Sequence, residues 1–276
     1  MLQPQIPYER IADAVGVVHP PASNDARIVS LVPSITELLC EMGLRDQLVG
    51  RTGFCIHPRA ALRDLTKVGG TKDVRFDTLR ALAPTHVIVN IDENRREVVD
   101  MLAPFVPHII VTHPCTPQDN HHLYRLLGAI FNRQAQARAL SAELAEAIGE
   151  VGAAGLPPEN VLYLIWRDPW MTVSRDTYVS AMLAHAGWAT WPADSAVRYP
   201  SFDWTAPWLA AVDRVLLSSE PYCFRDRHLA EVAALSGRPV SLIDGEMVSW
   251  YGSRAIAGMR YLASIRATLS GGTPER

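Results

Sequence analysis

Runs of apolar residues alternate along most of the chain with segments whose apolar positions recur at helical spacing. The run RIVSLV, which begins at Arg27, is almost continuously apolar, as expected for a strand buried on both faces of a parallel sheet. The next segment has apolar residues at positions 35, 38, 39 and 42, with Pro33 at its start and Gly43 after its end, which predicts a helix. Ser34 and Glu37 match a capping box at the start of that helix.

The same alternation predicts an α/β fold over two stretches of the chain. In the first stretch we expect strands at 47–50, 86–90 and 108–112, and helices at 76–83, 94–104 and 117–132. After the break GLPPEN we expect strands at 161–166, 214–218 and 239–244, and helices at 176–187 and 251–269. The pattern predicts two α/β lobes with mainly parallel sheets, at 1–132 and 156–276, joined by one long helix within 133–155.

Composition narrows the class of protein. The chain has 276 residues, 48% of them hydrophobic and 20% charged, with a net charge of −3, so no broad basic surface or nucleic-acid partner is expected. No run approaches the roughly 20 apolar residues of a membrane span, and membrane insertion is not expected.

The N-terminal segment MLQPQIPYERIADAVGVVHPP lacks the basic start and apolar core of a secretion signal. We therefore expect a cytoplasmic protein as the sequence is written, and a periplasmic one if the natural N-terminus carries a signal.

Several segments resemble one family of binding proteins. RIVSLVPSITELLCEMGLRDQLVGRTGFCIHP, VGGTKDVRFDTLRALAPTHVIVN, VLYLIWRDPWMTVSRDTYVSAML and DGEMVSWYGSRAIAGMRYLA are similar to the helical-backbone substrate-binding proteins of ABC importers for cobalamin, haem and siderophore-iron. The resemblance covers nearly the whole chain and is nearest to the cobalamin-binding branch. It implies a monomer with two lobes joined by a rigid helix, and a metal-chelate ligand, here cobalamin or another corrinoid, held between the lobes with no required cofactor.

Aromatic residues follow several of the predicted strands, where a flat macrocycle would find apolar surface. Packing within each lobe is the alternative for any one ring. Among the polar residues beside them, Arg167, Asp168, Glu246 and Arg254 are suited to hydrogen-bond the arms of a corrinoid or haem, with surface ion pairing as the alternative. Asp244 begins an Asp-Gly turn at the same edge. The expected ligand-binding residues are Phe54, His57, Trp166, Arg167, Trp170, Glu220, Glu246, Trp250 and Tyr251.

Two Cys/His pairs in the first lobe raise a second possibility. Cys55 and His57 follow one predicted strand, and His113 and Cys115 follow another, so the four side chains are expected at the same edge of a parallel sheet. Thiolate and imidazole suit zinc, which gives a metal-ion receptor as an alternative, while inert side chains or a disulfide between the two cysteines are further alternatives. No CxxC pair is present, and reduced thiols are the general expectation.

The resemblance also bears on partners and on catalysis. Glu37 matches the position of a glutamate that docks such proteins onto an importer permease, whereas Pro207 stands near the expected position of the second docking glutamate. This departure leaves open a cytoplasmic carrier or sensor.

The sequence has no GxSxG, GxxxxGK or GxGxxG motif in a suitable context, so an enzyme is not expected.

Overall fold

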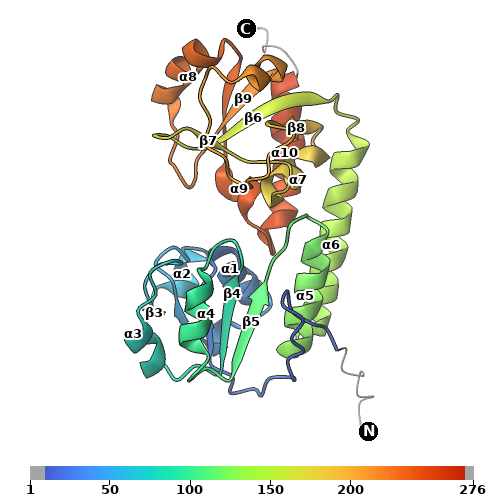
Figure 1. The fold of residues 1–276 in the computed structure, drawn as a ribbon. Coiled ribbons are helices and arrows are strands. Elements are labelled where there is room, and N and C mark those ends of the chain that lie inside the picture. Colours follow the sequence, from blue (N-terminus) through green and yellow to red (C-terminus); the bar gives the residue numbers. More distant parts are fainter. Residues whose placement is uncertain (1–9, 271–276) are drawn as a thin grey trace. The chain divides into compact units, whose positions relative to one another are not determined.

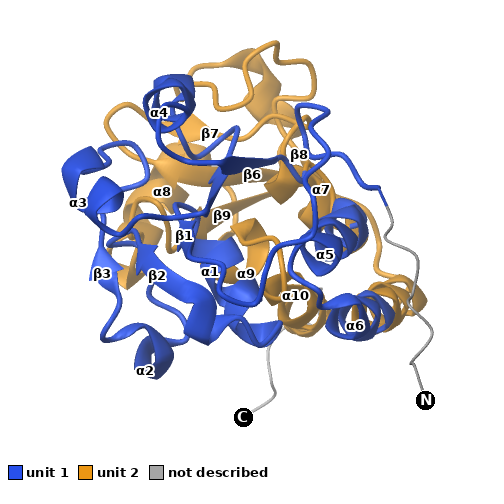
Figure 2. Ribbon diagram, turned by 90° about the horizontal axis from the view of Figure 1, so that it is seen from below, with its two compact units in different colours: residues 1–114, 118–142 blue, residues 115–117, 143–276 orange. Residues whose placement is uncertain are grey.

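The computed structural model describes residues 10–270, so part of the N-terminal segment on which the expectation about secretion rests lies outside the described residues. The described chain divides into two compact units (Figure 2). Unit 1 comprises the chain up to Pro114 together with Gln118–Ala142, and unit 2 comprises Cys115–Pro117 and the chain from Glu143 onward. The two α/β lobes expected from the sequence are confirmed.

Unit 1 contains a parallel sheet of five strands. The strand order is β3-β2-β1-β4-β5, and every neighbouring pair is parallel. The strands are β1 (Ile28–Ser30), β2 (Leu48–Arg51), β3 (Thr66–Lys67), β4 (His86–Asn90) and β5 (His108–Thr112). Strand β4 is buried along its whole length, as its continuous apolar run predicts. The carboxyl ends of all five strands lie at one edge of this sheet.

Helices follow most strands of unit 1. They are α1 (Pro33–Glu41), α2 (Arg59–Leu62), α3 (Phe76–Ala81), α4 (Arg96–Leu102) and α5 (Asp119–Ile130), with a 3₁₀ turn at Arg45–Gln47. The expected capping box of α1 is wrong. Val32 is the N-cap residue and makes no side-chain cap, because Pro33 occupies the first turn and moves Ser34 inside the helix.

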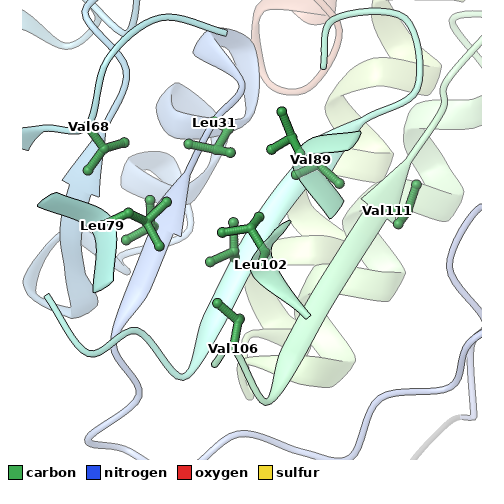
Figure 3. Close-up of a cluster of buried hydrophobic side chains, with 10 residues drawn as sticks. Leu31, Val68, Leu79, Val89, Leu102, Val106 and Val111 are labelled. Atoms are coloured by element: carbon green, nitrogen blue, oxygen red, sulfur yellow. The ribbon is translucent and has the colours of Figure 1, made fainter. Parts of the chain in front are cut away.

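One part of the core of unit 1 lies between the sheet and helices α3 and α4. Val87 and Val89 of β4 pack with Leu79 of α3 and Leu102 of α4, and Figure 3 shows this cluster of buried aliphatic side chains. Fully burying a side chain of this kind contributes about 1.5–3 kcal/mol. The cluster fixes the sheet, and thereby the loops that follow its strands.

Helix α6 (Gln134–Ala153) carries the chain from unit 1 into unit 2 (Figure 1). Its buried positions include Ala137, Leu144, Ala147 and Val151, which lie along one stripe of the helix. The long connecting helix expected within 133–155 is confirmed. The division between the two units falls inside this helix, after Ala142.

Unit 2 contains a second, mainly parallel sheet. Its order is β10-β9-β6-β7, with β8 also paired to β6, and only the pairing of β6 with β7 is antiparallel. The strands are β6 (Glu159–Trp166), β7 (Met171–Thr172), β8 (Trp188–Thr190), β9 (Arg214–Ser218) and β10 (Val240–Ile243). Because β6, β9 and β10 are parallel, the loops after these strands leave the sheet at one edge.

The helical elements of unit 2 include two helices that the sequence pattern missed. They are α7 (Tyr178–His185), α8 (Leu229–Ser236), α9 (Gly245–Ser249) and α10 (Arg254–Ser270), with 3₁₀ turns at Pro207–Ala211 and Asp226–His228. Helices α8 and α9 are the two that were missed, and α9, with five residues, is too short to show a clear helical period. Among the described residues, no helix is both long enough and apolar enough to cross a membrane.

Candidate functional site

The carboxyl edge of the sheet in unit 1 exposes large apolar side chains. Phe54 follows β2 and is 63% exposed, and Ile91 follows β4 and is 47% exposed. A β-carbon at Gly70, in the loop after β3, would lie 3.4 Å from Cε2 of Phe54, so the ring lies against this glycine. Ile56 is exposed in the same loop as Phe54. Apolar side chains gathered at one edge indicate a surface that contacts another molecule.

A buried asparagine pair, which was not predicted from the sequence, joins the loops of this edge. Oδ1 of Asn94 accepts a hydrogen bond from the backbone N–H of Asn90 over 2.8 Å, and Nδ2 of Asn94 donates to the carbonyl of Thr71 over 2.8 Å. Oδ1 of Asn90 accepts from the backbone N–H of Asp92 over 2.8 Å. These bonds link the loop after β4 to the loop after β3. The only sequence clue was a polar IDEN segment directly after a buried strand.

The loop after β2 turns Phe54 outward and Cys55 inward. The buried thiol of Cys55 contacts the hydroxyls of Thr36 and Thr52, each at 3.1 Å from Sγ. Burial raises the pKa of Cys55 above its ordinary value. Cys55 is therefore a neutral thiol in the core, and the guanidinium of Arg51 fixes the loop by donating to the carbonyl of Cys55 over 2.9 Å.

The structure does not assemble the expected Cys/His metal site. Among residues 10–270, no group of three or more His, Cys, Asp or Glu side chains is placed to hold a metal ion. Nε2 of His113 lies 3.5 Å from Oδ2 of Asp92, and Cys115 groups with unit 2, where Nη1 of Arg198 is 4.0 Å from its Sγ. His57 is half-buried in the loop after β2. All four cysteines are free thiols in this structure.

Trp166 is an exposed aromatic residue at the carboxyl edge of unit 2. It ends β6, is 40% exposed and meets the ring of Tyr222 edge to face, with centroids 5.8 Å apart. Tyr222 follows the neighbouring strand β9 and was not among the expected ligand-binding residues. Its position after a strand in the segment SSEPYCF was the available clue.

Trp170 lies only four residues beyond Trp166 but packs into unit 2. Its ring is half-buried and contacts Trp204 edge to face at 5.3 Å and Phe224 in a stacked arrangement at 6.3 Å. The guanidinium of Arg167 lies 5.7 Å from the centroid of Trp170 and pairs with Glu231 over 2.7 Å. These contacts favour the packing alternative for Trp170 and the ion-pair alternative for Arg167.

Glu220 occupies a largely desolvated position in unit 2. Its Oε1 accepts hydrogen bonds from Oγ of Ser249 over 2.6 Å and from Nε1 of Trp250 over 2.8 Å. Burial raises the pKa of Glu220, and the nearby carboxylates of Glu246 and Asp244 add to this shift, while the two hydrogen bonds oppose it. The arrangement holds a carboxyl group in a fixed orientation beside an indole.

The residues around Glu220 form an ordered polar network. Asp244 caps α9 by accepting from the backbone N–H of Glu246 over 3.0 Å, which gives structural meaning to the Asp-Gly turn. Arg254 pairs with Glu246 over 3.3 Å and lies 4.9 Å from the ring centroid of Trp250. Tyr251 is buried and meets Tyr178 edge to face at 5.7 Å.

The two positions considered for permease docking lie on different units. Glu37 is half-buried on α1 of unit 1. Pro207 is exposed and begins the 3₁₀ turn Pro207–Ala211 of unit 2.

His121 and His122 lie in α5, where His122 is exposed and His121 is half-buried.

A family model of periplasmic binding proteins matches residues 28–234. The chain belongs to the periplasmic binding protein family. This membership confirms the family resemblance drawn from the sequence motifs and the expectation that the protein is a binding protein and not an enzyme.

Two curated relatives share part of this sequence. The chain is 24% identical over 181 residues to the vitamin B12-binding protein of Pectobacterium atrosepticum, and the match covers 63% of this chain. It is 25% identical over 176 residues to the vitamin B12-binding protein of Photorhabdus laumondii, again over 63% of this chain. The match spans 64% of the length of each relative.

Solved structures of this family share the fold. The periplasmic vitamin B12 binding protein BtuF of Vibrio cholerae superposes with a TM-score of 0.75 at 20% identity, over 89% of this chain and 98% of that one. The periplasmic haem-binding protein RhuT from Roseiflexus sp. RS-1 gives 0.73 at 23% identity, over 88% and 98%. Both likenesses confirm two α/β units joined by a long helix.

Proposed function

We propose that this protein is the substrate-binding protein of an ABC importer and that its ligand is cobalamin or another corrinoid. The observation that carries the proposal is the exposed Phe54 at the carboxyl edge of unit 1, in a member of the periplasmic binding protein family. The names of the two curated relatives, both vitamin B12-binding proteins, support a corrinoid as the ligand.

A corrinoid offers a broad apolar ring with amide arms at its rim. Phe54, Ile56 and Ile91 supply exposed apolar surface on unit 1, and Trp166 supplies it on unit 2. Burying an aromatic side chain against a ligand favours binding, because apolar surface of both the protein and the ligand is removed from water. The free energy gained grows with the area that is buried. The asparagine pair beneath the unit 1 edge holds its loops in place before the ligand arrives, which lowers the ordering cost of binding.

Polar contacts with the rim of the ligand form a second part of the proposal. Glu220 is held by Ser249 and Trp250, so its carboxyl group needs little reorganisation to accept a hydrogen bond from an amide. His57, Arg167 and Glu246 remain proposed contacts on the basis of their positions near the carboxyl ends of strands. Tyr251, which follows α9 and is buried against Tyr178, is proposed to support the site by packing. Trp170 and Trp250 are proposed to support the site by packing beside it.

Other chelates compete with cobalamin as the ligand. Solved relatives include haem-binding proteins, such as HutB of Vibrio cholerae at 20% identity. Haem and siderophore-iron therefore remain alternatives within the same family. A bare metal-ion receptor is disfavoured, because the Cys55 thiol is buried and the Cys/His set is not assembled.

We propose delivery of the ligand to an importer permease, with Glu37 as a docking residue. The relatives of known structure are described as periplasmic, which supports this role over a cytoplasmic carrier or sensor. Pro207 in place of a second docking glutamate predicts weaker docking through unit 2. Cell fractionation separates the two compartments: recovery of the native protein from the cytoplasm alone would overturn the importer role.

The ligand is tested by titrating the purified protein with cyanocobalamin, cobinamide, haem and zinc. Binding is followed through quenching of tryptophan fluorescence and through the visible spectra of the three chelates, with seven tryptophans available as reporters. We expect saturable, stoichiometric binding of the corrinoids in preference to haem and zinc. If haem saturates the protein and no corrinoid binds, the proposed ligand changes from a corrinoid to haem. Binding of zinc alone would contradict a chelate receptor.

A further inference from the structure

Unit 1 contains a basic hollow between α2 and the edge of its sheet. The hollow has a volume of about 420 Å³. Gly53, Cys55, Ile56 and Leu62 form part of its lining. The remaining lining residues are all cationic: Arg51, Arg59, Arg63 and Lys67. Four cations around one hollow stand out in a chain whose net charge is −3.

These cations have no acidic partners in the part of the chain that the structure describes. None of the four takes part in the ion pairs of residues 10–270, and Asp64, which is adjacent to Arg63, does not pair with them either. Arg59 and Arg63 are four residues apart, a spacing that places like charges side by side along a helical turn at a small cost in stability. The hollow therefore concentrates uncompensated positive charge.

Arg51 gives the hollow a rigid wall. Its side chain is buried, and it donates from Nε to the carbonyl of Leu62 over 3.0 Å and from Nη1 to the carbonyls of Thr52 and Cys55 over 3.1 and 2.9 Å. None of these three bonds uses Nη2. The guanidinium is thus fixed in orientation before any ligand arrives, and an arginine fork held in this way suits a planar or tetrahedral oxyanion.

We propose that this hollow binds an oxyanion, a phosphate or carboxylate group that comes either from solution or from the periphery of a larger ligand. Arg59, Arg63 and Lys67 supply the neutralising charge and Arg51 the fixed guanidinium wall. The site is separate from the exposed side chain of Phe54, although Gly53, Cys55 and Ile56 of the same loop line it. The proposal does not depend on the identity of the chelate.

The test uses inorganic phosphate as the probe. The melting temperature of the full chain is measured at about 10 mM phosphate and in sodium chloride of matched ionic strength, with phosphate binding followed in parallel by ³¹P NMR line width. For a dissociation constant on the order of 1 mM we expect phosphate to raise the melting temperature by about 3–6 °C relative to chloride. The double variant Arg59→Gln/Arg63→Gln should lose this shift, and Arg59→Lys/Arg63→Lys should keep part of it.

The matched control removes two other exposed arginines of unit 1. Arg95→Gln/Arg96→Gln changes the net charge equally but should retain the full phosphate shift. Equal shifts in both glutamine double variants, or no difference between phosphate and chloride in the unmodified chain, would overturn the site. Once phosphate binding is established, phosphate is tested as a competitor of cyanocobalamin, which carries a phosphodiester, and of haem, which carries carboxylates. Competition with either chelate assigns the anion to the larger ligand, and independence from both assigns it to solution.

Discussion

The indole Nε1 of Trp250 donates a hydrogen bond to Oε1 of Glu220 over 2.8 Å, and Oγ of Ser249 donates to the same oxygen over 2.6 Å. The two donors belong to the end of α9, and the acceptor follows β9. The carboxyl group thereby joins two segments of unit 2 that are 29 and 30 residues apart in sequence.

Substitution Glu220→Gln is expected to change how stability depends on pH. The pKa of Glu220 is raised above 4.5 in the folded state, so the folded state binds the proton more tightly than the unfolded state does. Its contribution to stability is full below pH 4.5 and is lost as pH rises through the folded-state pKa. Since glutamine cannot ionise, urea unfolding should show the variant gaining stability over the unmodified protein between about pH 4.5 and pH 7.

The control for this experiment is Glu143→Gln, which alters an exposed glutamate of α6. It should leave the shape of the pH profile unchanged. If stability depends on pH in the same way in Glu220→Gln and in the unmodified protein, ionisation of Glu220 does not destabilise the folded state, which contradicts the prediction.

His86 predicts pH dependence of the opposite sign in unit 1. Burial lowers the pKa of His86 from 6.5 to about 4, with His108 and His19 adding to the shift through charge repulsion. The folded state therefore disfavours protonation of His86. The free energy of unfolding that is present above pH 6.5 falls by on the order of 3 kcal/mol as pH is lowered toward 4. Urea midpoints at pH 7.5 and 4.5 should differ less in His86→Gln than in the unmodified protein. The exposed His122→Gln is the control, and an unchanged difference in His86→Gln would refute this role.

The sequence pattern predicted the long elements of this fold and failed on the short ones. Runs such as HVIVN and RVLLS are five residues long and mostly apolar, and they form β4 and β9. The two-residue strands β3 and β7 are too short to show an alternating pattern, and they exist through their pairing with β2 and β6. The same limit explains the aromatic residues: Trp166 is exposed whereas Trp170 packs against Trp204, a contact set by the tertiary fold.

Two helical glycines should respond in opposite ways to a methyl group. A β-carbon at Gly258 of α10 would overlap with the backbone carbonyl of Met247, so Gly258→Ala should destabilise the protein by about 1–3 kcal/mol. A β-carbon at Gly149 of α6 would meet nothing within 4 Å. Gly149→Ala should therefore stabilise the protein by about 0.5–1 kcal/mol through helix propensity. Equal unfolding free energies for both variants would contradict the close packing of α10 on α9.

Thiol reactivity should distinguish Cys223 from Cys40 and Cys55. Cys223 is exposed, whereas burial raises the pKa of Cys40 to about 11 and also raises that of Cys55. Because the thiolate is the reactive form, DTNB should modify Cys223 well before Cys40 or Cys55 in the folded protein. Cys223→Ser should remove the fast phase. Protection of Cys55 by added zinc would contradict its placement as a core thiol.

The central claim is that aromatic surface at the carboxyl edges of the two sheets binds a corrinoid. Its most direct test is the dissociation constant for cyanocobalamin in Phe54→Ala, Trp166→Ala and the double variant. The controls are Met101→Ala and Leu235→Ala, which remove exposed apolar side chains elsewhere on units 1 and 2. Each aromatic variant should weaken binding about tenfold, equivalent to ~1.4 kcal/mol, with the losses adding in the double variant and no change in unfolding midpoint. Unchanged cobalamin affinity in the double variant would contradict the claim.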